Sequence, residues 1–128
     1  MEKPNRVLIV EDERPVQQLL SKLLRRMNLD YDLAGNGEEA MKKLDSSPGL
    51  YRIMIVDLLL PKLTGWDLLD YVGQNPLFEQ MKTIILTGAN TSEQETEKLS
   101  ASCDAVVQKG EFTIESFEQT LRELMEEA

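Results

Sequence analysis

The chain has 128 residues, the length of one ordinary domain with its own hydrophobic core. Its net charge of −9 disfavours direct binding to nucleic acid or to an anionic membrane, and the lack of histidine excludes histidine-based catalysis and metal binding. The single cysteine cannot form an internal disulfide, which suits a reducing compartment. The sequence shows no apolar leader and no long apolar run, so we expect a cytoplasmic protein. With no histidine to activate it, Cys103 is interpreted as a small buried hydrophobe.

Short apolar runs alternate with amphipathic segments through the first half of the chain. The runs predict strands at Arg6–Val10, Tyr31–Ala34 and Arg52–Val56. Between the first two strands, an apolar stripe predicts a helix that begins after Pro15 and ends before Asn28. A second helix is predicted at Glu38–Leu44, after the turn formed by Asn36 and Gly37, and the loop 46–49 follows it.

The second half of the chain continues the same alternation. Strands are predicted at Thr83–Leu86 and Ala105–Val107, and helices at Gly65–Gly73 and Ser92–Ala101. A last helix presents an apolar face made of Ile114, Phe117, Leu121, Leu124 and Met125. Five strands separated by helix-length segments predict one α/β domain over residues 1–128, with a doubly wound parallel sheet covered by helices on both faces.

Polar side chains stand where four of these strands end. Glu11, Asp12 and Glu13 follow the first strand, and Asp57 follows the third. Thr87 follows the fourth strand and Lys109 the fifth. Because the carboxyl ends of parallel strands share one edge of a sheet, where α/β proteins bind their ligands, these groups are expected to converge.

The convergent groups suit phosphoryl chemistry. Closely packed carboxylates repel one another unless a cation lies between them, and an all-oxygen set favours Mg²⁺. Lys109 and Thr87 can each donate a hydrogen bond to a phosphoryl oxygen. Asp57 is then the candidate nucleophile, since carboxylates form acyl phosphates.

Each of these residues also has a purely structural interpretation. The acids at 11–13 could cap the first helix, because negative charge is favoured at its amino end. Asp57 could begin a turn, Thr87 could belong to an ordinary loop, and Lys109 could be a solvated surface lysine. Their shared position at one sheet edge is what favours a functional site.

The segments VLIVEDE, AGNGEEAM, IVDLLLPKLTGWD, ILTG and VVQKG resemble the response-regulator receiver family over essentially the whole chain. The resemblance implies a flavodoxin-like fold with strand order 2-1-3-4-5. It also implies phosphorylation of Asp57 by a sensor histidine kinase or a histidine phosphotransfer protein, and signalling through protein contacts. The implied Mg²⁺ ligands are Asp12, Asp57 and the Leu59 carbonyl, with Glu11 acting through water. Thr87 and Lys109 match the switch hydroxyl and the phosphate-binding lysine.

Three residues depart from the family's common pattern. Glu11 replaces the commoner aspartate, Gly110 follows Lys109 in place of proline, and Val106 stands where an aromatic switch residue is usual. A docking module that keeps the acidic site but does not switch is therefore an open alternative. An aspartate-nucleophile phosphatase is a weaker one, because Leu59 occupies the position of its acid/base aspartate. No enzyme activity is expected beyond Mg²⁺-dependent self-phosphorylation and self-dephosphorylation, and both a stand-alone receiver and part of a longer regulator remain possible.

Overall fold

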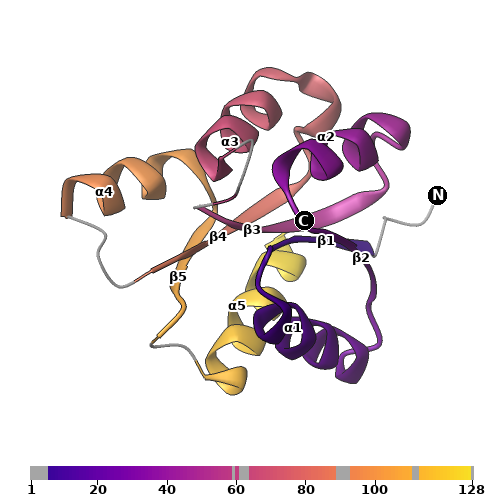
Figure 1. The fold of residues 1–128 in the computed structure, drawn as a ribbon, viewed down its shortest axis with the longest axis vertical. Helices are drawn as coiled ribbons and strands as arrows, with labels where there is room; N and C mark the ends of the chain where they lie inside the picture. Colours follow the sequence, from indigo (N-terminus) through magenta and orange to yellow (C-terminus); the bar gives the residue numbers. More distant parts are fainter. Residues whose placement is uncertain (1–5, 59, 61–63, 89–92, 111–112, 128) are drawn as a thin grey trace.

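The computed structural model describes residues 6–58, 60, 64–88, 93–110 and 113–127. Its centre is a five-stranded parallel sheet with the order β2-β1-β3-β4-β5 (Figure 1). The strands are β1 (Arg6–Val10), β2 (Asp30–Ala34), β3 (Tyr51–Asp57), β4 (Lys82–Thr87) and β5 (Ala105–Gln108). The predicted fold class and strand order are confirmed.

Helices cover both faces of this sheet. They are α1 (Arg14–Arg26), α2 (Gly37–Ser46), α3 (Gly65–Gln74), α4 (Glu93–Ser102) and α5 (Ile114–Glu127), with a short 3₁₀ turn η1 (Pro76–Phe78). In Figure 1, α1 and α5 lie on one face, and α2 and α3 lie on the other. No helix among the described segments is both long and apolar enough to cross a bilayer.

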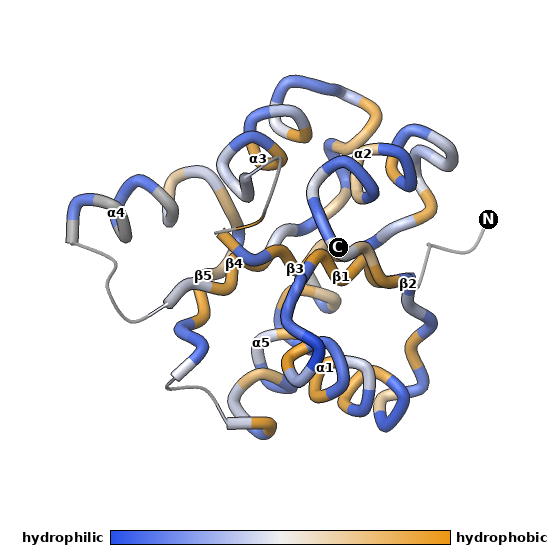
Figure 2. The backbone as a smooth tube through the Cα atoms, viewed as in Figure 1, coloured by the Kyte–Doolittle hydropathy of each residue, from blue (hydrophilic) through white to orange (hydrophobic). Residues whose placement is uncertain are grey.

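The central strands supply both halves of the core. Val7 and Ile9 of β1 pack with α1 and α5, whereas Leu8 and Val10 pack on the side of α2 and α3. This alternation follows from the period of two in a strand. All four side chains are fully buried, and Figure 2 shows β1 and β3 as hydrophobic. A strand buried on both faces reads as a continuous apolar run, as predicted.

Several elements extend beyond the predicted apolar runs. Asp57 is the last residue of β3 and Thr87 the last of β4, so both lie within strands that were expected to end one residue earlier. The reason is that backbone pairing continues into a polar residue, which hydrophobicity alone does not detect. Likewise, α2 begins at Gly37, after Asn36 caps the Glu39 amide, and Ser46 belongs to the helix. The predicted first residue of the fourth helix, Ser92, lies outside the described residues.

The end of α1 confirms the predicted role of Asn28. This residue adopts a left-handed φ of 60°. Its amide donates to the Arg25 carbonyl at 3.1 Å, and the Leu29 amide donates to the Leu24 carbonyl at 2.9 Å. These two bonds form a Schellman motif, which satisfies the last carbonyls of the helix and leads the chain into β2.

Gly65 fixes the distance between α3 and the end of β3. A Cβ atom at this residue would lie 2.7 Å from the Asp57 carbonyl oxygen and 2.8 Å from Leu58 Cα. The Gly65 amide also donates to the Leu58 carbonyl at 3.0 Å. The first turn of α3 is secured by a capping box between Thr64 and Asp67. Only glycine permits this approach of helix to strand, and the approach sets the backbone around Asp57.

Replacing this glycine tests the constraint. Gly65→Ala should lower the free energy of unfolding by about 1–3 kcal/mol, because backbone atoms must move to admit the methyl group. Gly73→Ala, in the same helix, is the matched control, since its Cβ would meet nothing within 4 Å. That control should leave stability unchanged or raise it by up to about 1 kcal/mol. Urea unfolding measures both, and equal stabilities for the two variants would contradict the packing argument.

Candidate functional site

The sheet register brings the predicted polar residues to one edge. Glu11 follows Val10, which pairs with Val56, so Glu11 lies beside Asp57. On the other side, Thr87 pairs with Gln108, the residue before Lys109. The Lys109 amide donates to the Thr87 carbonyl at 2.9 Å, which extends the ladder by one bond. Four groups that are far apart in sequence therefore meet as expected.

The Lys109 ammonium lies among three carboxylates. Its Nζ donates to Glu13 Oε2 at 2.7 Å, to Asp57 Oδ2 at 2.8 Å and to Glu11 Oε1 at 3.1 Å. Partial burial opposes the charged form of the lysine, but the hydrogen bonds to Asp57, Glu13 and Glu11 outweigh it and raise the pKa of Lys109. Lys109 is thus a charged counter-ion of the cluster, and its interpretation as a solvated surface lysine is wrong.

Glu11 is the most deeply buried member of the cluster, with no exposed surface. Its Oε1 accepts a hydrogen bond from the Glu13 amide at 3.0 Å as well as the one from Lys109. Burial, together with the nearby charge of Asp57, raises the pKa of Glu11 to about 7, although the Glu13 amide and Lys109 oppose this shift. The ionised form of Glu11 is thus less stable, relative to the protonated form, than that of a solvated glutamate.

The cluster fits a hard divalent cation. Glu11, Asp12 and Asp57 each offer an oxygen, and these oxygens lie within 4.8 Å of one another. Glu11 Oε2 is buried and lies 3.1 Å from Lys109 Nζ, yet it accepts no hydrogen bond from the described residues. A buried anionic oxygen that lacks a hydrogen-bond donor, beside two further carboxylates, is a ligand set suited to Mg²⁺. Leu59, the predicted carbonyl ligand, lies outside the described residues.

Capping of α1 does not account for the acidic run. The residue in the N-cap position is Glu13, but its side chain makes no capping hydrogen bond, and the first turn of α1 contains no acid. The Glu13 carboxylate instead binds Lys109. The sequence analysis did not predict the contact between Glu13 and Lys109. The signal that could have indicated it is the presence of a third acid directly after Glu11 and Asp12.

The two predicted switch residues lie in different surroundings. Thr87 is buried, and its hydroxyl donates to the Gly88 carbonyl at 3.3 Å. Val106 pairs with Ile85 in the sheet and packs, partly buried, against the core cluster on the side of α2 and α3. Gly110 is exposed, and a Cβ atom there would meet open space. Thr87 therefore belongs to the polar edge, whereas Val106 belongs to the core beside it.

Cys103 has the structural role that the sequence suggested. The side chain is partly buried against the same core cluster, and its thiol donates to the Ala105 carbonyl at 3.3 Å. Burial raises the pKa of Cys103 to about 11, so the thiol stays protonated at neutral pH. A protonated, packed thiol is a poor nucleophile.

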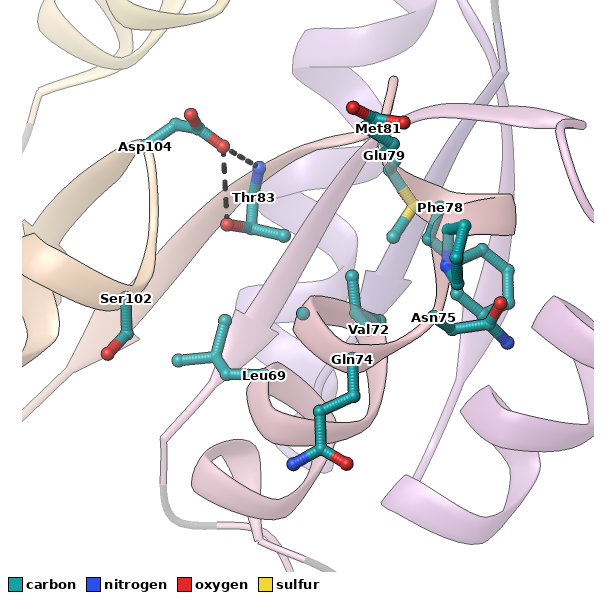
Figure 3. Close-up of a pocket in the computed structure, with 12 residues that line it drawn as sticks. Leu69, Val72, Gln74, Asn75, Phe78, Glu79, Met81, Thr83, Ser102 and Asp104 are labelled. Carbon is teal, nitrogen blue, oxygen red and sulfur yellow. Dashed lines mark hydrogen bonds between the residues drawn. The ribbon is translucent and has the colours of Figure 1, made fainter.

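A hollow of about 500 Å³ lies at the opposite end of β4 from Thr87 (Figure 3). Leu69, Val72, Phe78 and Met81 contribute apolar side chains to its wall. Asp104, one of its polar lining residues, accepts a hydrogen bond from the Thr83 amide at 2.7 Å. None of the acidic cluster, Thr87 or Lys109 lines this hollow, so it is separate from the candidate site.

Comparison with protein families gives a match to the response regulator receiver domain over residues 7–122. The gliding motility regulatory protein of Myxococcus xanthus is 29% identical over 119 residues, which make up 93% of this chain and 15% of that protein. The transcriptional regulatory protein CpxR of Escherichia coli K12 is 34% identical over 83 residues, or 65% of this chain and 33% of that protein. The chain thus spans a third or less of the length of these two relatives.

Solved structures share the same architecture. A response regulator receiver domain protein from Clostridium thermocellum superimposes with a TM-score of 0.83 at 20% identity, covering 95% of this chain and 94% of that one. The chemotaxis protein CheY4 of Vibrio cholerae gives a TM-score of 0.81 at 22% identity, covering 94% of this chain and 98% of that one. At these identities the likeness shows the fold alone.

Removal of the lysine tests its role as counter-ion. Lys109→Met should lower the free energy of unfolding of the metal-free protein by about 1–3 kcal/mol, because Glu11 and Asp57 lose their cation while remaining buried. Lys42→Met, at an exposed position of α2, removes the same charge and should change stability by less than about 0.5 kcal/mol. Urea unfolding in the presence of a chelator makes the comparison. An unchanged stability of the Lys109 variant would show that the three bonds to carboxylates contribute nothing.

Proposed function

This chain belongs to the response regulator receiver domain family, and on that premise we propose that Asp57 accepts a phosphoryl group from a phosphohistidine of a partner protein. The observation that carries the proposal is the position of the Asp57 carboxylate. It ends β3, is 5% exposed, lies 2.8 Å from the Lys109 ammonium, and shares a possible metal site with Glu11 and Asp12. A nucleophile, a cation and a carboxylate pair thus meet at the ligand-binding edge of the sheet.

The proposed reaction transfers the phosphoryl group directly from the donor nitrogen to the Asp57 carboxylate. A carboxylate oxygen of Asp57 forms a bond to phosphorus while the bond from phosphorus to the donor imidazole nitrogen breaks, and the electron pair stays on that nitrogen. Lys109 then binds a phosphoryl oxygen, and the Thr87 hydroxyl turns from the Gly88 carbonyl toward another. Bound Mg²⁺, held by Glu11, Asp12 and Asp57, would neutralise phosphoryl charge and orient the group.

The partners follow from the proposed reaction. The donor is a sensor histidine kinase or a histidine phosphotransfer protein, since each presents a phosphohistidine. The output would pass through protein contacts, because the net charge of −9 disfavours contact with nucleic acid.

A second candidate function rests on Val106. A β-branched side chain that packs against the core has no ring to exchange between two positions when Thr87 moves. A docking module that captures phosphate without switching is consistent with the same polar edge. An aspartate-nucleophile phosphatase has less support, because residue 59 is leucine where such enzymes need an acid/base aspartate.

Phosphorylation by acetyl phosphate tests the acceptor assignment. In the presence of Mg²⁺, the parent protein should gain one phosphoryl mass by intact-mass spectrometry, and Asp57→Asn should gain none because the nucleophilic carboxylate is lost. Asp70→Asn, at an exposed position of α3, is the control and should label like the parent. Labelling of the Asp57 variant at the rate of the parent would rule out this acceptor.

Metal binding tests the roles of the acidic pair. Asp12→Ala should lower Mg²⁺ affinity by more than about tenfold and abolish labelling, since a proposed direct ligand is lost. Glu11→Asp keeps the buried charge and should retain most of both. Isothermal titration calorimetry measures the affinities. If the parent protein binds no Mg²⁺, the proposed metal site is wrong.

A further inference from the structure

We propose that Glu13 is a positioning residue that competes with the phosphoryl group for the Lys109 ammonium and thereby sets how tightly phosphorylated Asp57 is held. The inference rests on the proposed phosphorylation of Asp57 and concerns the regulation of that same site. It begins from the 2.7 Å contact between Lys109 Nζ and Glu13 Oε2, the shortest of the three contacts that the ammonium makes with carboxylates of the described residues. This contact joins residues that are 96 positions apart in the sequence.

The hydrogen-bond capacity of Lys109 creates the competition. An ammonium group has three N–H donors. In this structure Glu13, Asp57 and Glu11 each accept one hydrogen bond from it. A phosphoryl oxygen can therefore gain a direct bond from Lys109 only when one of these carboxylates releases it.

Burial decides which carboxylate releases the lysine at the lowest free-energy cost. The side chain of Glu11 is fully buried and that of Asp57 is 7% exposed, so water cannot replace a lost ammonium at either. The side chain of Glu13 is 57% exposed, and its carboxylate can be hydrated when the contact breaks. Glu13 is also absent from the group of acids whose oxygens could share a metal. The bond between Glu13 and Lys109 is thus the one that the phosphoryl group replaces.

The helix does not need the Glu13 carboxylate. The backbone of Glu13, the N-cap residue of α1, is extended, with φ −85° and ψ 117°. The Glu13 carbonyl accepts a hydrogen bond from the Gln17 amide at 3.0 Å. The side chain makes no capping bond. A change at this side chain should therefore alter the electrostatics around Lys109 while leaving the start of α1 intact.

Competition predicts effects of opposite sign on two ligands. Glu13→Gln removes a negative charge near the metal and shifts Lys109 onto Asp57 and Glu11, so Mg²⁺ should bind more weakly. The same change frees a donor of Lys109 and removes repulsion of an incoming anion, so a phosphoryl mimic should bind more tightly. General damage to the site would weaken both ligands, which makes the opposite signs diagnostic.

Calorimetry on the full chain measures both affinities. Mg²⁺ is titrated first, and beryllofluoride is then titrated at a saturating Mg²⁺ concentration set for each variant. Glu13→Gln should weaken Mg²⁺ binding and strengthen beryllofluoride binding, each by about threefold to fivefold, as expected for one partly exposed ion pair. Glu13→Asp retains the charge and should restore values toward those of the parent.

The charge control is Glu79→Gln, which makes the same change in net charge at an exposed residue lining the hollow at the opposite end of β4. It should leave both affinities unchanged. If Glu13→Gln behaves like Glu79→Gln, or weakens both ligands, the competition is refuted while phosphorylation of Asp57 stands. If the parent protein binds no beryllofluoride in saturating Mg²⁺, the proposed function fails and the role of Glu13 fails with it.

Discussion

The site depends on a balance of charge at one edge of the sheet. Glu11 and Asp57 are buried carboxylates at the carboxyl ends of the adjacent strands β1 and β3, and such a pair is unfavourable without a cation. Lys109 supplies that cation and is shared with Glu13. In the proposed mechanism, two ligands change this balance of charge. Mg²⁺ adds positive charge among the acids, and the phosphoryl group then draws Lys109 away from Glu13. The positions of these few charges therefore couple the resting protein to its proposed phosphorylated form.

The fold holds these charges in place through backbone contacts. Parallel pairing carries the ends of β1, β3, β4 and β5 to one edge, and both faces of the sheet are covered, so the strand ends cannot move independently. The amide of Lys109 is bonded to the Thr87 carbonyl, which ties the lysine to the strand that carries the hydroxyl. Gly65 brings α3 against the end of β3 and limits the backbone around Asp57. The core thus supplies the rigidity that electrostatic positioning requires.

Sequence reasoning predicted the elements and their order because β-branched runs and helical stripes are strong local signals. It also placed Glu11, Asp57, Thr87 and Lys109 together, because strand ends in a parallel sheet share an edge. It missed the contact between Glu13 and Lys109. A side-chain pairing between residues so far apart in the sequence depends on their rotamers and on the relative positions of the segments that follow β1 and β5. The last residues of β3 and β4 were missed for a different reason: they are polar but still paired. Conformational switching could not be predicted from Val106, because switching is a difference in free energy between two states and leaves no local sequence pattern.

In the proposed mechanism, Lys109 exchanges a carboxylate partner for the phosphoryl group on Asp57. A crystal structure of the protein with Mg²⁺ and beryllofluoride would show whether this exchange occurs. We expect the adduct on the Asp57 carboxylate, with Lys109 Nζ within hydrogen-bond distance of a fluoride and the contact between Lys109 and Glu13 broken. An adduct on Asp57 with Lys109 still bonded to Glu13, or beryllofluoride bound elsewhere, would contradict it.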